Sequence, residues 1–168
     1  LGSLTERAKE LIVQFGRTAV SDAARGLSAE ELASCVEKTL KLDPIAAVRR
    51  ELIAEFPVFA SHTADGHEYA TSGIADALTL TPEGRPGTIV DWKSGRAIYP
   101  EAFLQNIAYQ HAAARRGLPS AQGLIVRVPK LVEDPAWEVM VVPETLVLDD
   151  FLAAARLWRW QRQMEGKP

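Results

Sequence analysis

Two strand-like segments that flank a dense turn signal constrain the fold of this chain more than any other feature. Residues 70–80 and 88–92 are rich in small, β-branched and apolar side chains, and the sequence between them contains Thr-Pro-Glu-Gly-Arg-Pro-Gly. This pattern predicts a β-hairpin. With the turn centred near residues 83–84, Asp76 would pair with Asp91, and their Cβ atoms would lie roughly 5 Å apart. The hairpin would then bring two carboxylates face to face.

The opposed carboxylates favour a bound cation, because two negative charges at this distance repel each other. Period-two alternation places Lys93 on the same face as Asp91. Ile74, Leu78 and Ile89 would share that face, so we expect the charged groups at the rim of a buried apolar surface. A slip of one residue in the register would remove this geometry.

Oxygen-only ligands of this kind suit a hard divalent ion such as Mg²⁺ or Mn²⁺. Such an ion polarises a phosphate group and lowers the pKa of a bound water molecule. A lysine beside it can hold the scissile phosphate or position the attacking water. The residues therefore predict a metal-dependent phosphodiesterase site. An ordinary hairpin with a solvated aspartate and an Asp–Lys ion pair is the simpler alternative.

Three short motifs occur in series along this part of the chain. The sequence reads Gly-Ile-Ala-Asp at 73–76, Asp-Trp-Lys-Ser-Gly at 91–95, and Gln-x-x-x-Tyr at 105–109. Together they resemble the RecB-family branch of the PD-(D/E)XK nucleases. The greatest likeness is to the C-terminal nuclease domain of AddA-type helicase–nucleases, whose motor is UvrD/Rep-like. The resemblance spans residues 1 to about 142.

The resemblance implies a role for each residue of the motifs. Asp76 and Asp91 would bind the metal ion, and the backbone carbonyl of Trp92 would join its ligands. Lys93 would be catalytic, together with the two aspartates. The glutamine and tyrosine of the last motif would bind substrate, and they are Gln105 and Tyr109.

Two upstream segments extend the resemblance. The family has a Glu-Pro-like strand before the hairpin, which residues 55–59 match, so Glu55 is expected to support the metal ligands from behind. The family also begins with a helix of the form Arg-Gly-x-x-x-His, whose histidine binds metal. Here Glu6 stands at that position, and a carboxylate is also a hard ligand. However, Ser3 and Glu6 also fit a capping box, so metal ligand and helix cap are both open interpretations of Glu6.

The expected fold class is α/β. The resemblance implies a PD-(D/E)XK restriction-endonuclease-like core of the αβββαβ type, in which helices flank a mixed central sheet, with a helical N-terminal addition. Periodicity, capping signals and turns predict helices over 4–15, 28–41, 43–50, 100–116 and 148–163, and strands over 52–60, 70–80, 88–92, 122–128 and 137–142. Pro57 favours an edge position for the first strand.

Length and composition fit one globular domain, residues 1–168, divided into a helical part (1–50), a catalytic sheet core (51–142) and a C-terminal helix (143–168). Hydrophobic residues make up 47% and charged residues 24%, as in ordinary globular proteins. No signal peptide and no apolar run near the length of a membrane helix is present, so we expect a cytoplasmic protein without a membrane segment. A lone Cys35 excludes an internal disulfide. The start at Leu-Gly-Ser rather than Met indicates a fragment of a longer chain.

The resemblance implies a DNA nuclease, with exonuclease action, that processes ends in double-strand break repair and recombination. Its partners would be DNA ends or single strands, the helicase domains of the parent chain, and a second nuclease subunit. A stand-alone phage or restriction-type nuclease of the same superfamily is one alternative. A non-catalytic domain that keeps the fold and binds DNA or a partner protein is another.

The charge of the chain bears on how it would hold DNA. A net charge of −3 predicts weak intrinsic affinity, since non-specific binding comes mainly from Lys and Arg at phosphates. A motor that feeds the strand would compensate. Basic residues in or after the site region could still form a local groove: Arg96, Arg115, Arg116, Arg127 and Lys130. In the last helix, Trp158 and Trp160 cannot both face one core, which favours either a contact with a missing domain or loose packing.

Overall fold

The computed structural model describes residues 3–64, 66–80, 87–130 and 133–166. They form two compact units, which meet in sequence between Arg49 and Arg50. The predicted turn at residues 83–84 lies outside the described residues. No helix within the described ranges is long and apolar enough to cross a membrane.

The N-terminal unit is helical, as predicted. It contains α1 (Leu4–Gln14), a short 3-10 turn η1 (Ala23–Arg25), α2 (Ala29–Leu40) and α3 (Asp43–Val48). Ser3 and Ser28 cap α1 and α2, each accepting a hydrogen bond from a backbone amide in the first turn. Ala8, Ile12 and Ala29 form a small apolar cluster that holds these two helices together. The capping signals in the sequence therefore placed the starts of these helices well.

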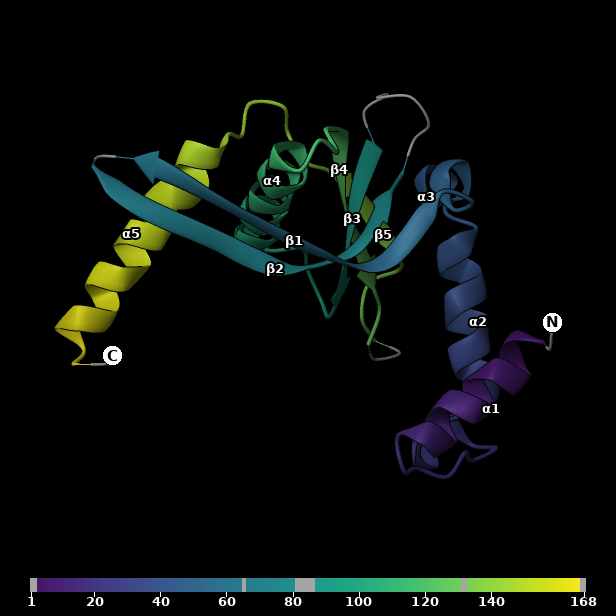
Figure 1. Ribbon diagram of the computed structural model, residues 1–168. Coiled ribbons are helices and arrows are strands. Elements are labelled where there is room, and N and C mark those ends of the chain that lie inside the picture. Colours follow the sequence, from purple (N-terminus) through teal and green to yellow (C-terminus); the bar gives the residue numbers. More distant parts are fainter. Residues whose placement is uncertain (1–2, 65, 81–86, 131–132, 167–168) are drawn as a thin grey trace. The chain divides into compact units, whose positions relative to one another are not determined.

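The larger unit is a mixed sheet with helices, which confirms the predicted α/β class (Figure 1). Its described elements are β1 (Leu52–Ala64), β2 (His67–Thr79), β3 (Gly87–Ser94), α4 (Pro100–Arg115), β4 (Ser120–Val128), β5 (Glu138–Val141) and α5 (Leu148–Met164). The strands follow the order β1-β2-β3-β4-β5, and β1 lies at an edge as Pro57 predicted. Neighbours pair antiparallel except β3 and β4, which are parallel and are joined through α4.

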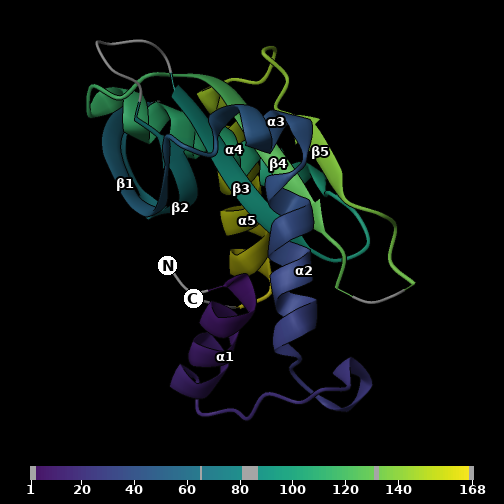
Figure 2. The same cartoon turned by 90° about the vertical axis from the view of Figure 1, so that its right-hand side faces the viewer.

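Helix α4 covers the sheet at the point where the site motifs lie (Figure 2). It starts with Pro100 at its first position and ends before Gly117, whose φ of 79° few other residues adopt. Its buried face is made of small residues, with one amide among them: Ala102, Asn106, Ala108, Ala112 and Ala113. The larger apolar residues of this helix are only partly buried: Phe103, Leu104 and Ile107. Alanines allow the helix to approach the strands closely.

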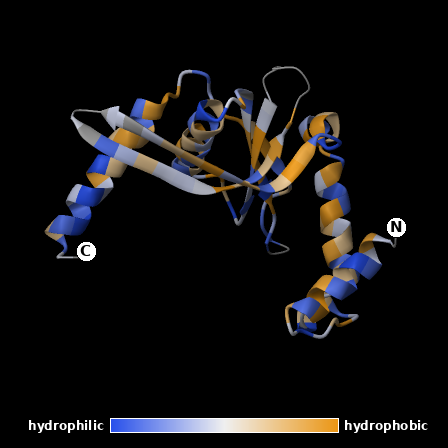
Figure 3. Ribbon diagram, viewed as in Figure 1, coloured by the Kyte–Doolittle hydropathy of each residue, from blue (hydrophilic) through white to orange (hydrophobic). Residues whose placement is uncertain are grey.

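The main apolar core lies between α4 and the first three strands. Val58, Ala75, Leu78 and Ile89 pack there with the alanines of α4. Figure 3 shows apolar residues gathered on the central strands, while the C-terminal end of α5 is largely hydrophilic.

Strand β2 changes its buried face at Asp76. On one side of this residue, odd-numbered Ala75 faces α4, whereas on the other side even-numbered Leu78 does. The pairs Ala54–Ala77 and Phe56–Ala75 flank Glu55 and Asp76, so these two residues lie opposite each other where the β1–β2 ladder is interrupted. Glu55 has a φ of 53°, in the left-handed region that costs a non-glycine residue about 1 kcal/mol. The unusual backbone of β1 therefore coincides with the change in alternation of β2.

This change overturns one prediction from the alternation pattern. Ile74 was expected beside Leu78 on the buried face, but its side chain is 58% exposed. Ala75 occupies the buried position instead and is 0% exposed. A strict period of two along β2 assumed a regular strand, and the alternation breaks at Asp76, opposite the left-handed backbone of Glu55.

Candidate active site

The β2–β3 register brings the two predicted aspartates together. Ala77 pairs with Val90 and Leu78 with Ile89, so the next position of the ladder places Asp76 opposite Asp91. Asp76 Oδ2 accepts a hydrogen bond of 2.7 Å from the backbone N–H of Trp92. This bond fixes the Asp76 carboxylate across the ladder, beside Asp91, as expected from the sequence.

Asp91 is a buried carboxyl group in an unfavourable environment. The residue is 1% exposed, and its Oδ2 forms an ion pair of 2.6 Å with Lys93 Nζ. Burial is the main cause that raises the pKa of Asp91 above its ordinary value, and the neighbouring Asp76 raises it further. The ammonium of Lys93 opposes both effects. The net direction is upward, so Lys93 compensates the charge of Asp91 only in part.

A chain of polar contacts connects this carboxylate to α4. Lys93 Nζ donates a hydrogen bond of 2.9 Å to Gln105 Oε1, and Gln105 Nε2 donates one of 2.9 Å to the hydroxyl oxygen of Tyr109. Gln105 and Tyr109 share one face of the helix because they are one turn apart. The last motif thus meets the lysine of the middle motif directly. The predicted substrate-binding pair lies within this network and holds the lysine in place.

The glycine of the first motif makes room for this network. A Cβ atom on Gly73 would lie 2.8 Å from Tyr109 Cε1 and 3.0 Å from its hydroxyl oxygen. These distances are shorter than side chains tolerate, so only glycine lets β2 pass this close to the ring. Gly73, Asp76, Gln105 and Tyr109 therefore form one spatial arrangement, although they come from two separate motifs.

The Gly73→Ala substitution tests this close approach. We expect the new methyl group to displace Tyr109 and weaken its contact with Gln105, which lowers stability by about 1–3 kcal/mol. Thermal unfolding of Gly73→Ala, Tyr109→Ala and the double variant measures the coupling. In the double variant the clash is absent, so its loss should be smaller than the sum of the two single losses. Strictly additive losses would contradict the contact.

The two remaining predicted residues have different surroundings. Glu6 completes the capping box of α1: its Oε2 accepts from the Ser3 N–H at 2.7 Å, and its own N–H donates to Ser3 Oγ at 3.2 Å. The cap interpretation is thus confirmed, and a metal role stays a prediction. Glu55 is exposed and lies next to Asp76 through its backbone. Support of the metal ligands by its side chain stays a prediction.

A buried polar network beneath the site was not predicted. Asn106 is 0% exposed, and its side-chain amide donates to the Ile89 carbonyl at 3.4 Å and accepts from Gln110 at 2.9 Å. Gln110 in turn accepts from Ser120. A Cβ on Gly123 would lie 2.2 Å from Asn106 Oδ1, so the glycine admits the amide. Glycine in the middle of an apolar strand was the available signal, because it marks a close approach.

The prediction that Arg127 could contribute to a basic DNA groove is wrong. It is 2% exposed and forms an ion pair of 3.1 Å with Glu138. Its guanidinium also donates to the backbone carbonyls of Gly95, Pro135 and Ala136. It therefore fastens the loop that follows Lys93 to the loop before β5. The residues around Arg127 form an apolar strand pattern. Such a pattern does not reveal that carbonyl groups of other segments would hold the arginine in a buried position.

The donor set fits a hard divalent cation. Two carboxylates face each other, and the buried one has a raised pKa although it is paired with Lys93. A divalent cation between them would supply the remaining compensation. No group of three or more His, Cys, Asp or Glu side chains that could hold a metal occurs within the described ranges. Backbone carbonyls such as that of Trp92, together with water and substrate oxygens, would have to complete the coordination.

Comparisons with known proteins bear on the fold. No protein-family model matches the chain, and no curated protein matches its sequence. Among solved structures, the crystal structure of a protein named SSO0001 is similar, with a TM-score of 0.51 and 12% identity, over 90% of this chain and 68% of that one. A crystal structure from Eubacterium rectale named a "putative exonuclease" is also similar, with a TM-score of 0.50 and 11% identity, over 95% of this chain and 62% of that one. At these identities the chain shares their fold.

Proposed function

We propose that this protein is a divalent-metal-dependent DNA nuclease. The observation that carries the proposal is the opposed pair Asp76 and Asp91, with Lys93 Nζ 2.6 Å from the buried carboxylate. A purely structural hairpin gains nothing from two facing carboxylates, one of them buried with its pKa raised. The structural similarity to a protein named an exonuclease supports the same class of reaction.

In the proposed reaction, Asp76 and Asp91 would hold Mg²⁺ or Mn²⁺, and the Trp92 carbonyl would be a further ligand. When bound, the ion polarises the scissile phosphate and acidifies a bound water molecule. The backbone N–H of Trp92 fixes the Asp76 carboxylate by a hydrogen bond of 2.7 Å. This preorganisation lets the carboxylate meet the ion without rearrangement.

Lys93 would supply positive charge at the phosphate during attack. Gln105 Oε1 accepts a hydrogen bond from its ammonium, and Tyr109 accepts one from Gln105, so the lysine is oriented from α4. Its side chain is 32% exposed, which leaves it accessible to a substrate. Binding of substrate would draw Lys93 from Asp91 towards the phosphate, while Gln105 and Tyr109 orient the strand.

The biological setting is a finer part of the same proposal. The motifs support the nuclease domain of an AddA-type helicase–nuclease, acting as an exonuclease on DNA ends in double-strand break repair. The helicase domains of a parent chain and a second nuclease subunit would then be partners. Reading the parent open reading frame tests this setting: helicase motifs upstream of residue 1 are expected, and a short frame without them would contradict it.

The cleavage assay tests the activity itself. Linear single-stranded and double-stranded DNA are incubated with the protein and Mn²⁺, Mg²⁺ or EDTA. We expect degradation with either metal ion and none with EDTA. Calorimetric titration of Mn²⁺ provides an independent readout, with a saturable site in the wild type and none in Asp91→Ala. Equal heats in both proteins would remove the proposed metal site, whether or not DNA is degraded.

A further inference from the structure

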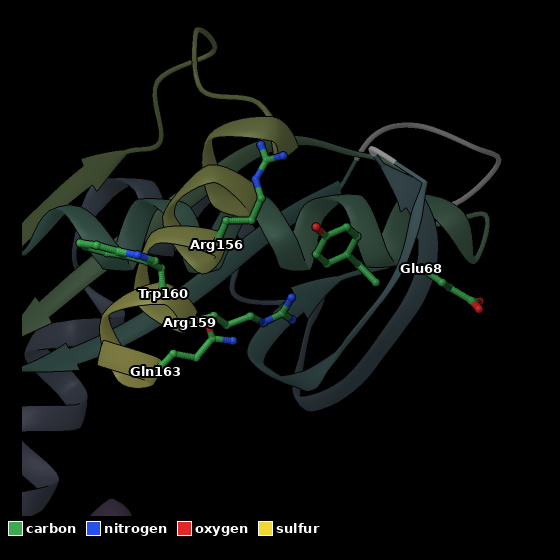
Figure 4. Close-up of a pocket in the computed structure, with 6 residues that line it drawn as sticks. Glu68, Arg156, Arg159, Trp160 and Gln163 are labelled. Carbon is green, nitrogen blue, oxygen red and sulfur yellow. The ribbon is translucent and has the colours of Figure 1, made fainter. Parts of the chain in front are cut away.

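A groove outside the candidate active site lies between α5 and the N-terminal end of β2 (Figure 4). Its volume is about 410 Å³, and it is lined by Glu68, Tyr69, Arg156, Arg159, Trp160 and Gln163. The lining thus combines two aromatic rings, two guanidinium groups and an amide with one carboxylate.

The residues of α5 that line the groove lie on one face of the helix. Arg156, Arg159, Trp160 and Gln163 recur at intervals of three and four residues, which places them side by side along the helix. Leu152, one turn earlier on this face, is 3% exposed and anchors the helix to the protein. From Phe151 to Met164 the sequence contains three arginines and no acidic residue. This segment is therefore locally cationic in a chain of net charge −3, although Asp150 and Glu165 flank it.

The chemistry of the groove suits a single nucleic-acid strand. Trp160 is 57% exposed, whereas Tyr69 is only 8% exposed and has the guanidinium of Arg159 5.3 Å from its ring centroid. Exposed aromatic faces stack on unpaired bases of any sequence, while arginines contact the phosphates between them. A peptide partner would need either a deep apolar pocket or several hydrogen-bonding edges. The open, cationic and aromatic lining favours the nucleic acid.

The groove and the candidate active site lie along the same face of β2. Tyr69, Gly73 and Ala75 are separated by even numbers of residues in a continuous register, so they share a face. Gly73 contacts Tyr109 and Ala75 packs on α4, so this is the α4 face. Tyr69 and Asp76 are seven residues apart, roughly 24 Å along the strand. At the roughly 3.4 Å per nucleotide of a fully stacked strand, that distance corresponds to at most about seven nucleotides.

We propose that this groove binds single-stranded DNA at most about seven nucleotides from the scissile phosphate. The inference rests on the proposed nuclease function for its occupant. Trp160 would stack on a base, Arg156 and Arg159 would contact phosphates, and the Tyr69 ring would hold the Arg159 guanidinium in place. The groove would hold the strand that the candidate active site cleaves, and it would supply the DNA affinity that the net charge of the chain does not.

Binding is measured without cleavage, by fluorescence anisotropy of a labelled 20-nucleotide oligo(dT) in EDTA, with Lys93→Ala as the parent protein. Trp160→Ala in this background should weaken binding about tenfold. Arg156→Gln with Arg159→Gln should reduce the slope of log affinity against log salt by about 1.4, or about 0.7 for each phosphate that an arginine no longer neutralises.

The helix supplies its own matched control. Trp158 is also 57% exposed, and Arg162 lies 4.9 Å over its ring, but neither residue lines the groove. Trp158→Ala with Arg162→Gln removes the same residue types from another face of α5. These control substitutions should leave both affinity and salt slope as in the parent. Equal losses in groove and control variants, or no loss in the groove variants, would overturn the proposal.

Photo-crosslinking keeps the test independent of variant folding. A 20-nucleotide strand with a single 5-iododeoxyuridine is irradiated with the Lys93→Ala protein, and the attached peptide is mapped. Crosslinks at Trp160 are expected, and crosslinks confined to other segments would overturn the proposed binding groove. If the groove binds DNA and the wild type never cleaves it, only the proposed nuclease function is refuted. If the wild type cleaves DNA and the groove variants bind it normally, only the proposed binding groove is refuted.

Discussion

Replacing Lys93 with alanine should lower the rate of DNA cleavage by about 100-fold to 10,000-fold. The ammonium lies 2.6 Å from Asp91 and is held by Gln105, so no other described side chain can replace its charge at the same place. Single-turnover cleavage of an end-labelled oligonucleotide with Mn²⁺ measures the effect. Lys93→Arg should restore little of the rate, because a planar guanidinium does not reproduce a compact ammonium held by one glutamine.

The control for this prediction is a lysine of the same type elsewhere. Lys41 forms a surface ion pair of 2.7 Å with Glu37, and its side chain is 68% exposed. Lys41→Ala should cleave at the wild-type rate, since exposed pairs of this kind contribute little. Cleavage by Lys93→Ala at the same rate as Lys41→Ala would show that the activity comes from elsewhere, and it would remove the catalytic assignment.

The second prediction with a large effect is that Mn²⁺ raises the thermal stability of the wild type. At a Mn²⁺ concentration about 100 times its dissociation constant, the wild type should gain about 2.7 kcal/mol of unfolding free energy. For a protein of this size that gain corresponds to a rise in Tm of about 5–10 °C. Asp91→Asn should show no such rise, because it lacks the buried carboxylate that the ion compensates. Asp43→Asn, on the exposed first turn of α3, is the matched control and should respond like the wild type.

Without metal, we expect Asp91→Asn to be more stable than the wild type. The pKa of Asp91 is raised in the folded state, so between its unfolded pKa and its folded pKa the folded protein binds more protons than the unfolded one. Its contribution to stability is therefore complete below the unfolded pKa and is lost as pH rises through the folded value. In EDTA at neutral pH, the free energy of unfolding of Asp91→Asn should exceed that of the wild type by about 1 kcal/mol, and its Tm should be higher. A lower Tm for the variant would contradict this account of the site.

The sequence contained enough information to predict the pairing of the two aspartates. Their register depends on local alternation and on one turn, and both leave a clear pattern in a single hairpin. The same holds for the starts of α1 and α2, where capping residues act within one turn. The resemblance placed Gln105 and Lys93 in one site with separate roles, and the structure adds the hydrogen bond between them.

Features that depend on distant partners could not be predicted in this way. The burial of Arg127 requires carbonyls from two loops that the strand pattern does not reveal. The approach of Asn106 to Gly123 depends on how closely α4 packs on β4. The exposure of Ile74 follows from an irregular residue in the neighbouring strand, Glu55, and not from its own surroundings in sequence. Each of these is decided by packing between segments.

The backbone of β1 has a further consequence for the behaviour of the protein in solution. An edge strand presents a row of free N–H and C=O groups that can pair with a second molecule and start aggregation. Pro57 lacks an N–H group, and Glu55 two residues earlier has left-handed backbone geometry, so the row in β1 is interrupted twice within one short stretch. At the opposite edge, β5 is only four residues long. The sheet can therefore end at both sides without offering a template to another chain.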